Sequence, residues 1–137
     1  MNKLPPLFRL LGTAHALEAR LEDRLAPLSL SLAKLGVLRV LAEGGEALPL
    51  SELAGKLGCV RSNMTQLIDR LEKDGWVRRA ADADDRRVQR ATLTPAGRRV
   101  YTAGKRVLAA EERAVAAALS GADTAALDRM LGRIGKR

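Results

Sequence analysis

Apolar residues recur at three- and four-residue steps over most of the chain, a spacing typical of amphipathic helices. The clearest stripe follows Pro5 and Pro6, which can open a helix because the amide that proline lacks is unpaired there anyway. Its members are Leu7, Leu10, Leu11, Ala14, Leu17, Leu21 and Leu25. The pattern predicts a long first helix that ends before Pro27.

The same spacing predicts five further helices. They cover approximately residues 31–43, 50–57, 61–74, 95–119 and 123–134. We expect Ser51 and Thr94 to cap two of them, because a hydroxyl can accept a hydrogen bond from a free backbone amide. Gly58 and Ser120-Gly121 are expected to interrupt the helical pattern.

From Trp76 onward the apolar residues no longer follow the helical spacing. Residues 76–80 and 88–93 are predicted to be strands, and the charged segment 81–87 between them forms the long tip of a β-hairpin. Two helices joined by a glycine-containing turn and followed by a charged hairpin indicate a winged helix-turn-helix. The expected fold class is therefore mostly α with a small β-hairpin wing, in the order α-α-α-α-β-β-α-α.

Composition and net charge narrow the classes of molecule that the protein can bind. The 137 residues suit one domain, and the formal net charge is +8. Residues 61–106 hold 12 Lys and Arg against 6 Asp and Glu, so most of the excess charge lies on the presumed reading helix, the hairpin and the following helix start. This distribution favours double-stranded DNA as partner. The scarcity of aromatic residues argues against a stacking platform for single strands.

Candidate DNA contacts lie near the start of the fourth helix. Asn and Gln can pair with adenine edges, Ser and Thr suit several bases, and arginine suits phosphates. The predicted base-reading residues are Ser62, Asn63, Thr65 and Gln66, flanked by Arg61 and Arg70. The apolar positions of the same helix, Met64, Leu67, Ile68 and Leu71, are predicted to be core.

At these residues the chain resembles a known family. The segment LSELAGKLGCVRSNMTQLIDRLEKDGWV (50–77) and the wing DADDRRVQRATLTPAGR look like the multiple-antibiotic-resistance-regulator (MarR) family. The resemblance implies a homodimeric regulator whose first and last helices build the dimer, with small phenolic or lipophilic ligands bound between the dimer interface and the DNA-binding lobe. We therefore expect one MarR-like domain over 1–137, with a DNA-binding lobe at 31–94 and a dimerisation region at 1–30 and 95–137.

Within the wing, Asp85 and Arg87 match the D-x-R element of the family. The resemblance implies that the arginine enters the minor groove while the aspartate holds it, and the enhanced negative potential of a narrow groove suits a guanidinium. Arg86 and Arg90 are expected to touch phosphates.

The sequence departs from the family before the fourth helix, at Val60, where the family usually has Ser or Thr as helix cap. Either Ser62 caps a helix that starts later, or that helix end is less ordered before DNA binds.

The most concrete expectation is a cytoplasmic dimeric repressor that binds a palindromic operator and is released by a small ligand, with His15 and Arg39 as candidate ligand contacts. Two alternatives stay open: a thiol-oxidation sensor that uses Cys59, the single cysteine, and an architectural protein without sequence preference. No enzyme motif, metal-ligand cluster, cofactor site or membrane-spanning segment is evident in the sequence.

Overall fold

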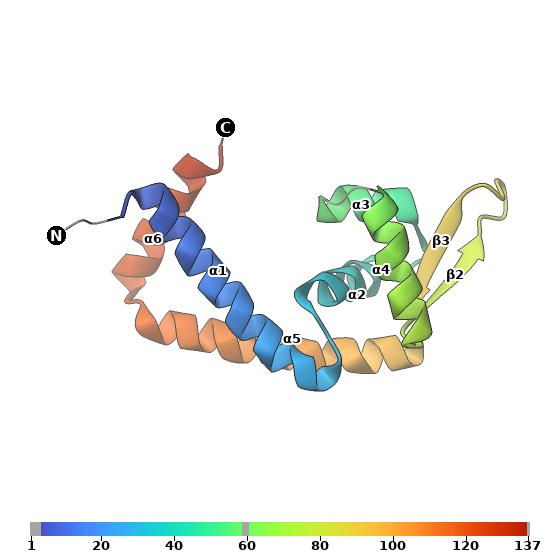
Figure 1. Ribbon diagram of the computed structural model, residues 1–137, viewed down its shortest axis with the longest axis horizontal. Coiled ribbons are helices and arrows are strands. Elements are labelled where there is room, and N and C mark those ends of the chain that lie inside the picture. Colours follow the sequence, from blue (N-terminus) through green and yellow to red (C-terminus); the bar gives the residue numbers. More distant parts are fainter. Residues whose placement is uncertain (1–3, 59–60, 137) are drawn as a thin grey trace.

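The computed structural model describes residues 4–58 and 61–136, and within them the chain is mainly helical with one small sheet (Figure 1). The elements are α1 (Pro6–Leu25), the 3₁₀ helix η1 (Ala26–Leu28), α2 (Leu32–Gly44), β1 (Leu48–Pro49), α3 (Leu50–Leu57), α4 (Arg61–Lys73), β2 (Val77–Ala81), β3 (Gln89–Leu93), α5 (Pro95–Ala118) and α6 (Gly121–Ile134). Helices α3 and α4 followed by a hairpin form a winged helix-turn-helix. The predicted fold class is confirmed.

Local signals explain most helix ends. Pro6 opens α1, and Thr94 caps α5, since its hydroxyl accepts from the Gly97 amide at 3.0 Å. The prediction for Ser51 was wrong. Helix α3 begins at Leu50 with Pro49 as its N-cap and has no side-chain cap hydrogen bond, so Ser51 lies inside the first turn.

The sheet has one strand more than predicted. Its order is β1-β3-β2, with both pairs antiparallel. The predicted hairpin is present, with Val77 opposite Leu93 and Ala81 opposite Gln89. Strand β1 pairs Leu48 with Ala91. It has only two residues, one of them a proline, so it leaves no alternating pattern to detect.

Helix α6 begins earlier than the predicted start at Asp123. The Ser120 hydroxyl accepts from the Asp123 amide at 3.1 Å, and the Asp123 carboxylate accepts from the Ser120 amide at 3.0 Å. This reciprocal capping box pairs two backbone donors at the helix start, which allows Gly121 to be the first helical residue.

The core lies mainly in the winged-helix lobe and extends onto the end of α1, the turn after it and the first half of α5. Its buried side chains are Leu25, Leu30, Leu35, Val37, Leu38, Leu41, Leu50, Leu53, Ala54, Met64, Ile68, Leu71, Val77, Ala91 and Tyr101. Two glycines let α5 approach the lobe closely. A Cβ at Gly97 would lie 2.1 Å from the Trp76 carbonyl oxygen, and one at Gly104 would lie 2.7 Å from Leu35 Cδ1.

Helix α5 connects the lobe to the other helices, as Figure 1 shows along the lower edge of the molecule. Helix α1 packs on α5, where the Glu111 carboxylate pairs with Arg24 at 2.8 Å and with Arg20 at 3.3 Å. The start of α1 lies beside α6, at the end of the molecule opposite the wing (Figure 1). The fold therefore separates a winged-helix lobe from a helical end built from α1 and α6.

Within the described ranges, no single helix is long and apolar enough to cross a membrane, although the bent pair Pro6–Leu28 and Leu32–Gly44, at 74°, satisfies length and composition together. The same residues contain no group of three or more His, Cys, Asp or Glu side chains placed to hold a metal ion.

Candidate nucleic-acid interface

Helix α4 separates an apolar from a polar face. Met64, Ile68 and Leu71 are fully buried, as the spacing predicts, and Leu67 is half-buried. The opposite face carries the exposed residues Asn63, Thr65, Gln66 and Arg70. The structure thus brings four of the predicted DNA contacts to one accessible side of a helix whose other side is fixed in the core. Such a helix has the dimensions that the major groove accepts.

The tip of the wing presents one arginine with its carboxylate partner. Asp85 Oδ1 accepts from the Arg87 amide at 3.0 Å and from Arg87 Nε at 3.1 Å, and Arg87 Nη2 lies 3.4 Å from Oδ2. The bond from the Arg87 side chain, followed by that from its amide, lowers the pKa of the Asp85 carboxyl. Although it is paired, the Arg87 side chain is 91% exposed. The predicted ion pair is present. It holds one edge of the guanidinium, and the rest of the group stays exposed to solvent.

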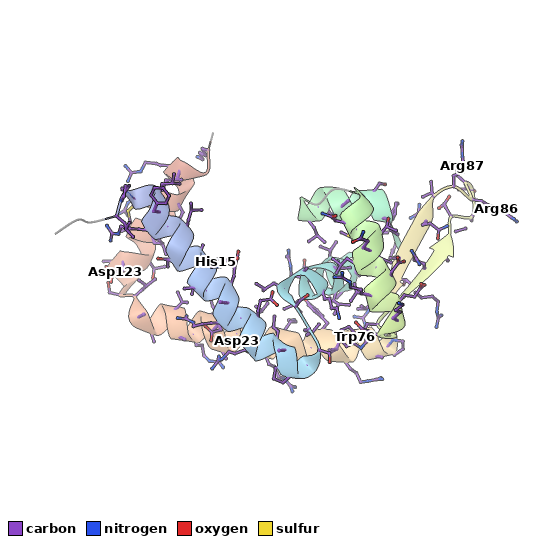
Figure 2. The ribbon with its side chains drawn as sticks, viewed as in Figure 1. His15, Asp23, Trp76, Arg86, Arg87 and Asp123 are labelled. Atoms are coloured by element: carbon purple, nitrogen blue, oxygen red, sulfur yellow. The ribbon has the colours of Figure 1, made fainter. Side chains whose placement is uncertain are left out.

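Figure 2 shows Arg86 and Arg87 at the far end of the hairpin, both directed away from the protein. The turn that carries them is organised by Asp82, whose Oδ2 accepts from the amides of Asp84 at 3.0 Å and Asp85 at 3.1 Å. Asp82 Oδ1 accepts from Arg90 Nε, and this bond is the main reason that the pKa of the Asp82 carboxyl is lowered. Asp82 and Asp85 therefore hold the loop in shape and pair with Arg90 and Arg87.

Arg90 has two partners inside the protein. Besides Asp82 it reaches the Ala47 carbonyl oxygen with Nη1 at 3.1 Å. This contact ties the wing to the residues just before β1, so the described contacts of Arg90 are structural. Its contact with phosphate stays a prediction.

A second set of contacts, which was not predicted from the sequence, joins the wing to α4. Arg79 of β2 places Nη2 2.7 Å from Asp69 Oδ1 and 3.0 Å from Glu72 Oε1, both on α4. Its amide also donates to Glu72 Oε2 at 3.2 Å, and this backbone bond is the largest cause of the lowered pKa of the Glu72 carboxyl. The only sequence signal was a pair of acids three residues apart on one helix, near a basic strand.

A small hollow of about 130 Å³ lies between α3, α4 and the wing. Its lining includes Thr65 from α4, Arg87 and Gln89 from the hairpin, and Ser51 from α3. Residues from the two predicted DNA-reading elements therefore share one surface. A ligand that lies along α4 would meet the base of the wing as well.

The two candidate ligand contacts do not share a site in the structure. His15 lines an open hollow of about 500 Å³ between α1 and α2, together with Glu18, Glu22 and Leu32. Arg39 is not among the residues that line it. It lies further along α2, half exposed and 3.7 Å from Glu43. Both assignments stay predictions.

Four of the sequence assignments concern the turn before α4 and the first two residues of that helix. Cys59 and Val60 lie outside the described residues, as do the side chains of Arg61 and Ser62. The structure therefore tests neither the thiol-sensing alternative nor the cap of α4.

Comparison with known proteins agrees with this geometry. Residues 30–89 match the model of the MarR family. The uncharacterized HTH-type transcriptional regulator YfiV of Bacillus subtilis is 38% identical over 74 residues, which is 54% of this chain and 46% of that protein. The transcriptional repressor MprA of Escherichia coli is 45% identical over 47 residues, 34% of this chain and 27% of that protein. The chain spans less than half the length of these curated relatives.

Solved structures extend the likeness of the fold to nearly the whole chain. A mutant of E. coli MarR in complex with operator DNA superposes with a TM-score of 0.82 at 24% identity, over 94% of this chain and 93% of that one. The S. aureus MepR–DNA complex gives a TM-score of 0.87 at 18% identity, over 96% and 97%. The helical end built from α1 and α6 is therefore part of the shared architecture.

Proposed function

We propose that the protein is a dimeric, sequence-specific DNA-binding transcriptional regulator of the MarR type, since residues 30–89 match the model of that family. It acts as a repressor released by a small lipophilic or phenolic ligand. Its DNA-reading residues are the polar face of α4 and the tip of the wing. The assignment of the lobe to residues 31–94, and of the dimer to 1–30 and 95–137, is part of this proposal.

The observation that carries the proposal is the paired but exposed guanidinium of Arg87. A carboxylate at a surface that binds DNA is repelled by phosphates unless it serves a cation nearby. Asp85 does so with bonds to both the amide and the side chain of Arg87. The pair reduces the freedom that Arg87 would otherwise lose on entering a minor groove. The ion pairs of Arg79 hold the wing against α4, and the bond from Arg90 to the Ala47 carbonyl holds it against the chain before β1.

Exposed apolar surface supports a dimer. Among the described residues, every large apolar side chain that is strongly exposed belongs to the start of the chain or to α6. These are Leu4, Leu7, Phe8, Leu10, Leu11, Met130, Leu131 and Ile134. Part of this surface lines an apolar groove of about 350 Å³ between α1 and α6. Contiguous apolar patches on soluble proteins mark interaction sites, and a second copy of the same helices is the occupant we propose.

Release by a ligand requires a connection between the helical end and α4. The hollow beside His15 is bordered by the N-terminus of α2, where Glu22 Oε1 of α1 accepts from the Leu32 amide at 2.8 Å. A ligand that separates α1 from α2 would shift the lobe relative to the dimer axis. It would thereby favour dimers whose two reading helices no longer match half-sites about 34 Å apart.

The test is selection of bound sequences from a random double-stranded DNA pool with the full chain. We expect an inverted repeat whose half-sites are centred about one helical turn apart. An enriched pool without a shared motif, or a specificity ratio near one against random DNA, favours the architectural alternative and contradicts the proposal. Light scattering on the same sample tests the dimer, and a monomer at micromolar concentration contradicts that part.

A further inference from the structure

One face of α5 carries cations that the proposed operator-reading surface does not use. Between residues 86 and 110 the chain has seven Lys and Arg and no Asp or Glu. Three of the seven belong to the wing. The other four are exposed on the first half of α5, and we call them the outer face of α5: Arg98, Arg99, Lys105 and Arg106.

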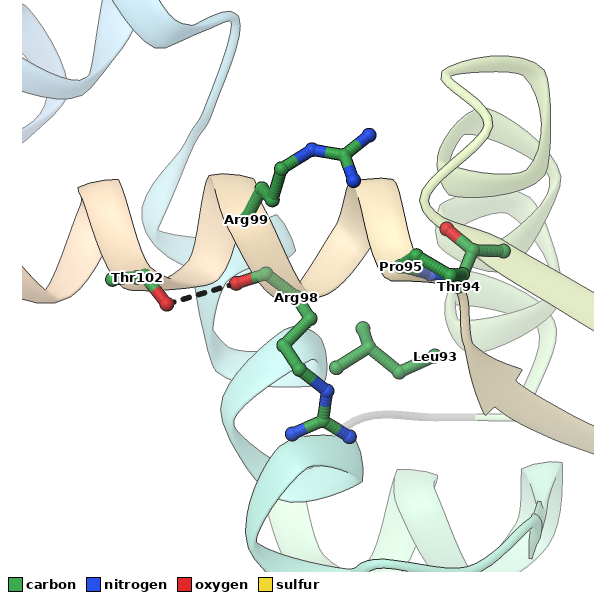
Figure 3. Close-up of a pocket in the computed structure, with 6 residues that line it drawn as sticks. All are labelled: Leu93, Thr94, Pro95, Arg98, Arg99 and Thr102. Atoms are coloured by element: carbon green, nitrogen blue, oxygen red, sulfur yellow. Dashed lines mark hydrogen bonds between the residues drawn. The ribbon is translucent and has the colours of Figure 1, made fainter.

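The four cations form two rows along the helix. Arg98 and Lys105 are seven residues apart, as are Arg99 and Arg106, so each row spans about 10 Å along the helix axis. Figure 3 shows the guanidinium groups of Arg98 and Arg99 leaving α5 in different directions, one for each row. Thr102 lies between the rows, and its hydroxyl donates to the Arg98 carbonyl at 3.0 Å. At the start of α5, Arg98, Arg99 and Thr102 line an open hollow of about 380 Å³.

These cations are not neutralised within the protein. Among the described residues none of the four has a carboxylate within 4 Å, whereas Arg79, Arg87 and Arg90 of the hairpin all do. Lys105 has a ring as neighbour instead, with Nζ 5.4 Å from the centre of Tyr101. The outer face of α5 therefore presents an uncompensated positive charge to solvent.

The outer face of α5 also lies away from the operator-reading surface. Gly97, Tyr101 and Gly104 form the buried side of α5, which packs against the winged-helix lobe, and the cations occupy the other side. The wing tip is separated from the start of α5 by the length of β3, about 17 Å for five extended residues. In Figure 1 the tip lies at the upper right and α5 along the lower edge.

We propose that the outer face of α5 binds the phosphate backbone of a second double-helical DNA segment while α4 and the wing hold the operator. The inference rests on the proposed function, since it requires a first duplex on the reading surface. Lys and Arg that neutralise phosphates release condensed counterions, which gives affinity without sequence preference. Each protein dimer thus joins two DNA segments, one chosen by sequence and the other by charge alone.

The experiment compares two variants with the wild-type chain. The test variant is Arg98→Gln/Arg99→Gln/Arg106→Gln, which keeps Lys105 on Tyr101. The control is Arg129→Gln/Arg133→Gln/Lys136→Gln, which removes the same charge from exposed positions at the other end of the molecule. An operator duplex obtained by selection is fixed to a surface and saturated with protein. Capture of a labelled duplex of unrelated sequence is then measured against salt concentration, and light scattering confirms that both variants keep the oligomeric state.

We expect the wild type and the control to capture the second duplex. The test variant should capture at least about tenfold less of the second duplex. The slope of log affinity against log salt concentration should be smaller by up to about 2.7 for each chain engaged, since three phosphate contacts are lost. Its affinity for the single operator duplex should stay within about twofold of the wild type. Absence of capture by the wild type overturns the inference and leaves the proposed function standing. Equal loss in the control also overturns it. A parallel loss of single-operator affinity assigns these cations to the first duplex and overturns it too. Failure to select any operator contradicts the proposed function itself.

Discussion

Lys34 at the start of α2 and Asp74 directly after α4 form an ion pair, with 2.8 Å between Nζ and Oδ2. The same ammonium donates to the Ser29 carbonyl at 3.3 Å and lies 5.4 Å above the Trp76 ring. Both side chains of the pair are mostly shielded, at 18% and 28% exposed. One side chain thus connects the turn after α1, the end of the reading helix and the root of the wing.

Replacing Lys34 with methionine should lower the free energy of unfolding by about 1–2 kcal/mol, because a partly shielded charge pair and a charged hydrogen bond are lost. Urea denaturation gives the value. Lys56→Met serves as the control, since Lys56 is exposed on α3 and has no ion pair among the described residues. Equal stability of the Lys34 and Lys56 variants would show that this contact contributes nothing.

Two glycines, one on α5 and one on α3, should respond in opposite directions to alanine. Gly97→Ala drives a Cβ against the Trp76 carbonyl, which is backbone and cannot give way, so we expect a loss of about 3 kcal/mol or more. Gly55→Ala has open space around it in the middle of α3 and should gain about 0.5–1 kcal/mol from the reduced entropy of the unfolded chain. Thermal unfolding of both variants checks the contrast, and a tolerated Gly97→Ala would contradict the close approach of α5 to the lobe.

Arg79 is expected to act by positioning the wing, not by touching phosphate. Arg79→Gln should weaken operator binding by about three- to tenfold, because the wing is no longer preorganised against α4. The slope of affinity against salt should stay unchanged, since no phosphate contact is removed. The neighbouring Arg78→Gln, at an exposed position of the same strand, is the matched control. A salt slope lowered by about one in Arg79→Gln would instead indicate a direct phosphate contact.

Low pH should destabilise the winged-helix lobe, because it protonates the Glu72 carboxylate. Hydrogen bonds from Arg79 hold the pKa of the Glu72 carboxyl below its usual value in the folded chain, so the folded state binds fewer protons than the unfolded state. Its stabilisation is fully present above the ordinary carboxyl pKa of about 4.3 and is lost as the pH falls through the lower folded pKa. In Glu72→Gln the midpoint of urea unfolding should fall less between about pH 5 and pH 2 than in the wild type. An identical decrease in both proteins would contradict a role for this carboxylate.

Elements with a local cause could be predicted from the sequence. Pro6 and the Thr94-Pro95 pair mark the starts of two helices, and the buried positions of α4 follow from its spacing. The missed features depend on distant partners. Strand β1 exists only because β3 passes beside it. The extent of α3 was predicted correctly, and only its cap was wrong, because Pro49 and not Ser51 holds the N-cap position.

In the site too, contacts between residues close in sequence could be predicted, and contacts between different elements could not. The Asp85–Arg87 pair spans two residues and could be inferred from the hairpin alone, whereas the partners of Arg79 lie on another element. Arg90 combines both kinds of contact. Its place in a basic wing predicts a phosphate contact, which stays a prediction, whereas its bonds to Asp82 and the Ala47 carbonyl become visible only once the fold brings the hairpin beside the chain before β1.

Arg87→Ala is the variant that tests most sharply whether α4 and the wing read DNA. A gel mobility-shift titration with the selected operator should show affinity reduced by about tenfold or more, because an arginine held for the minor groove is lost. The far-ultraviolet circular dichroism and the unfolding temperature should match the wild type, since the side chain is 91% exposed. Arg133→Ala on α6 should leave affinity unchanged. Unchanged affinity in Arg87→Ala, with the fold intact, would contradict DNA reading by the wing.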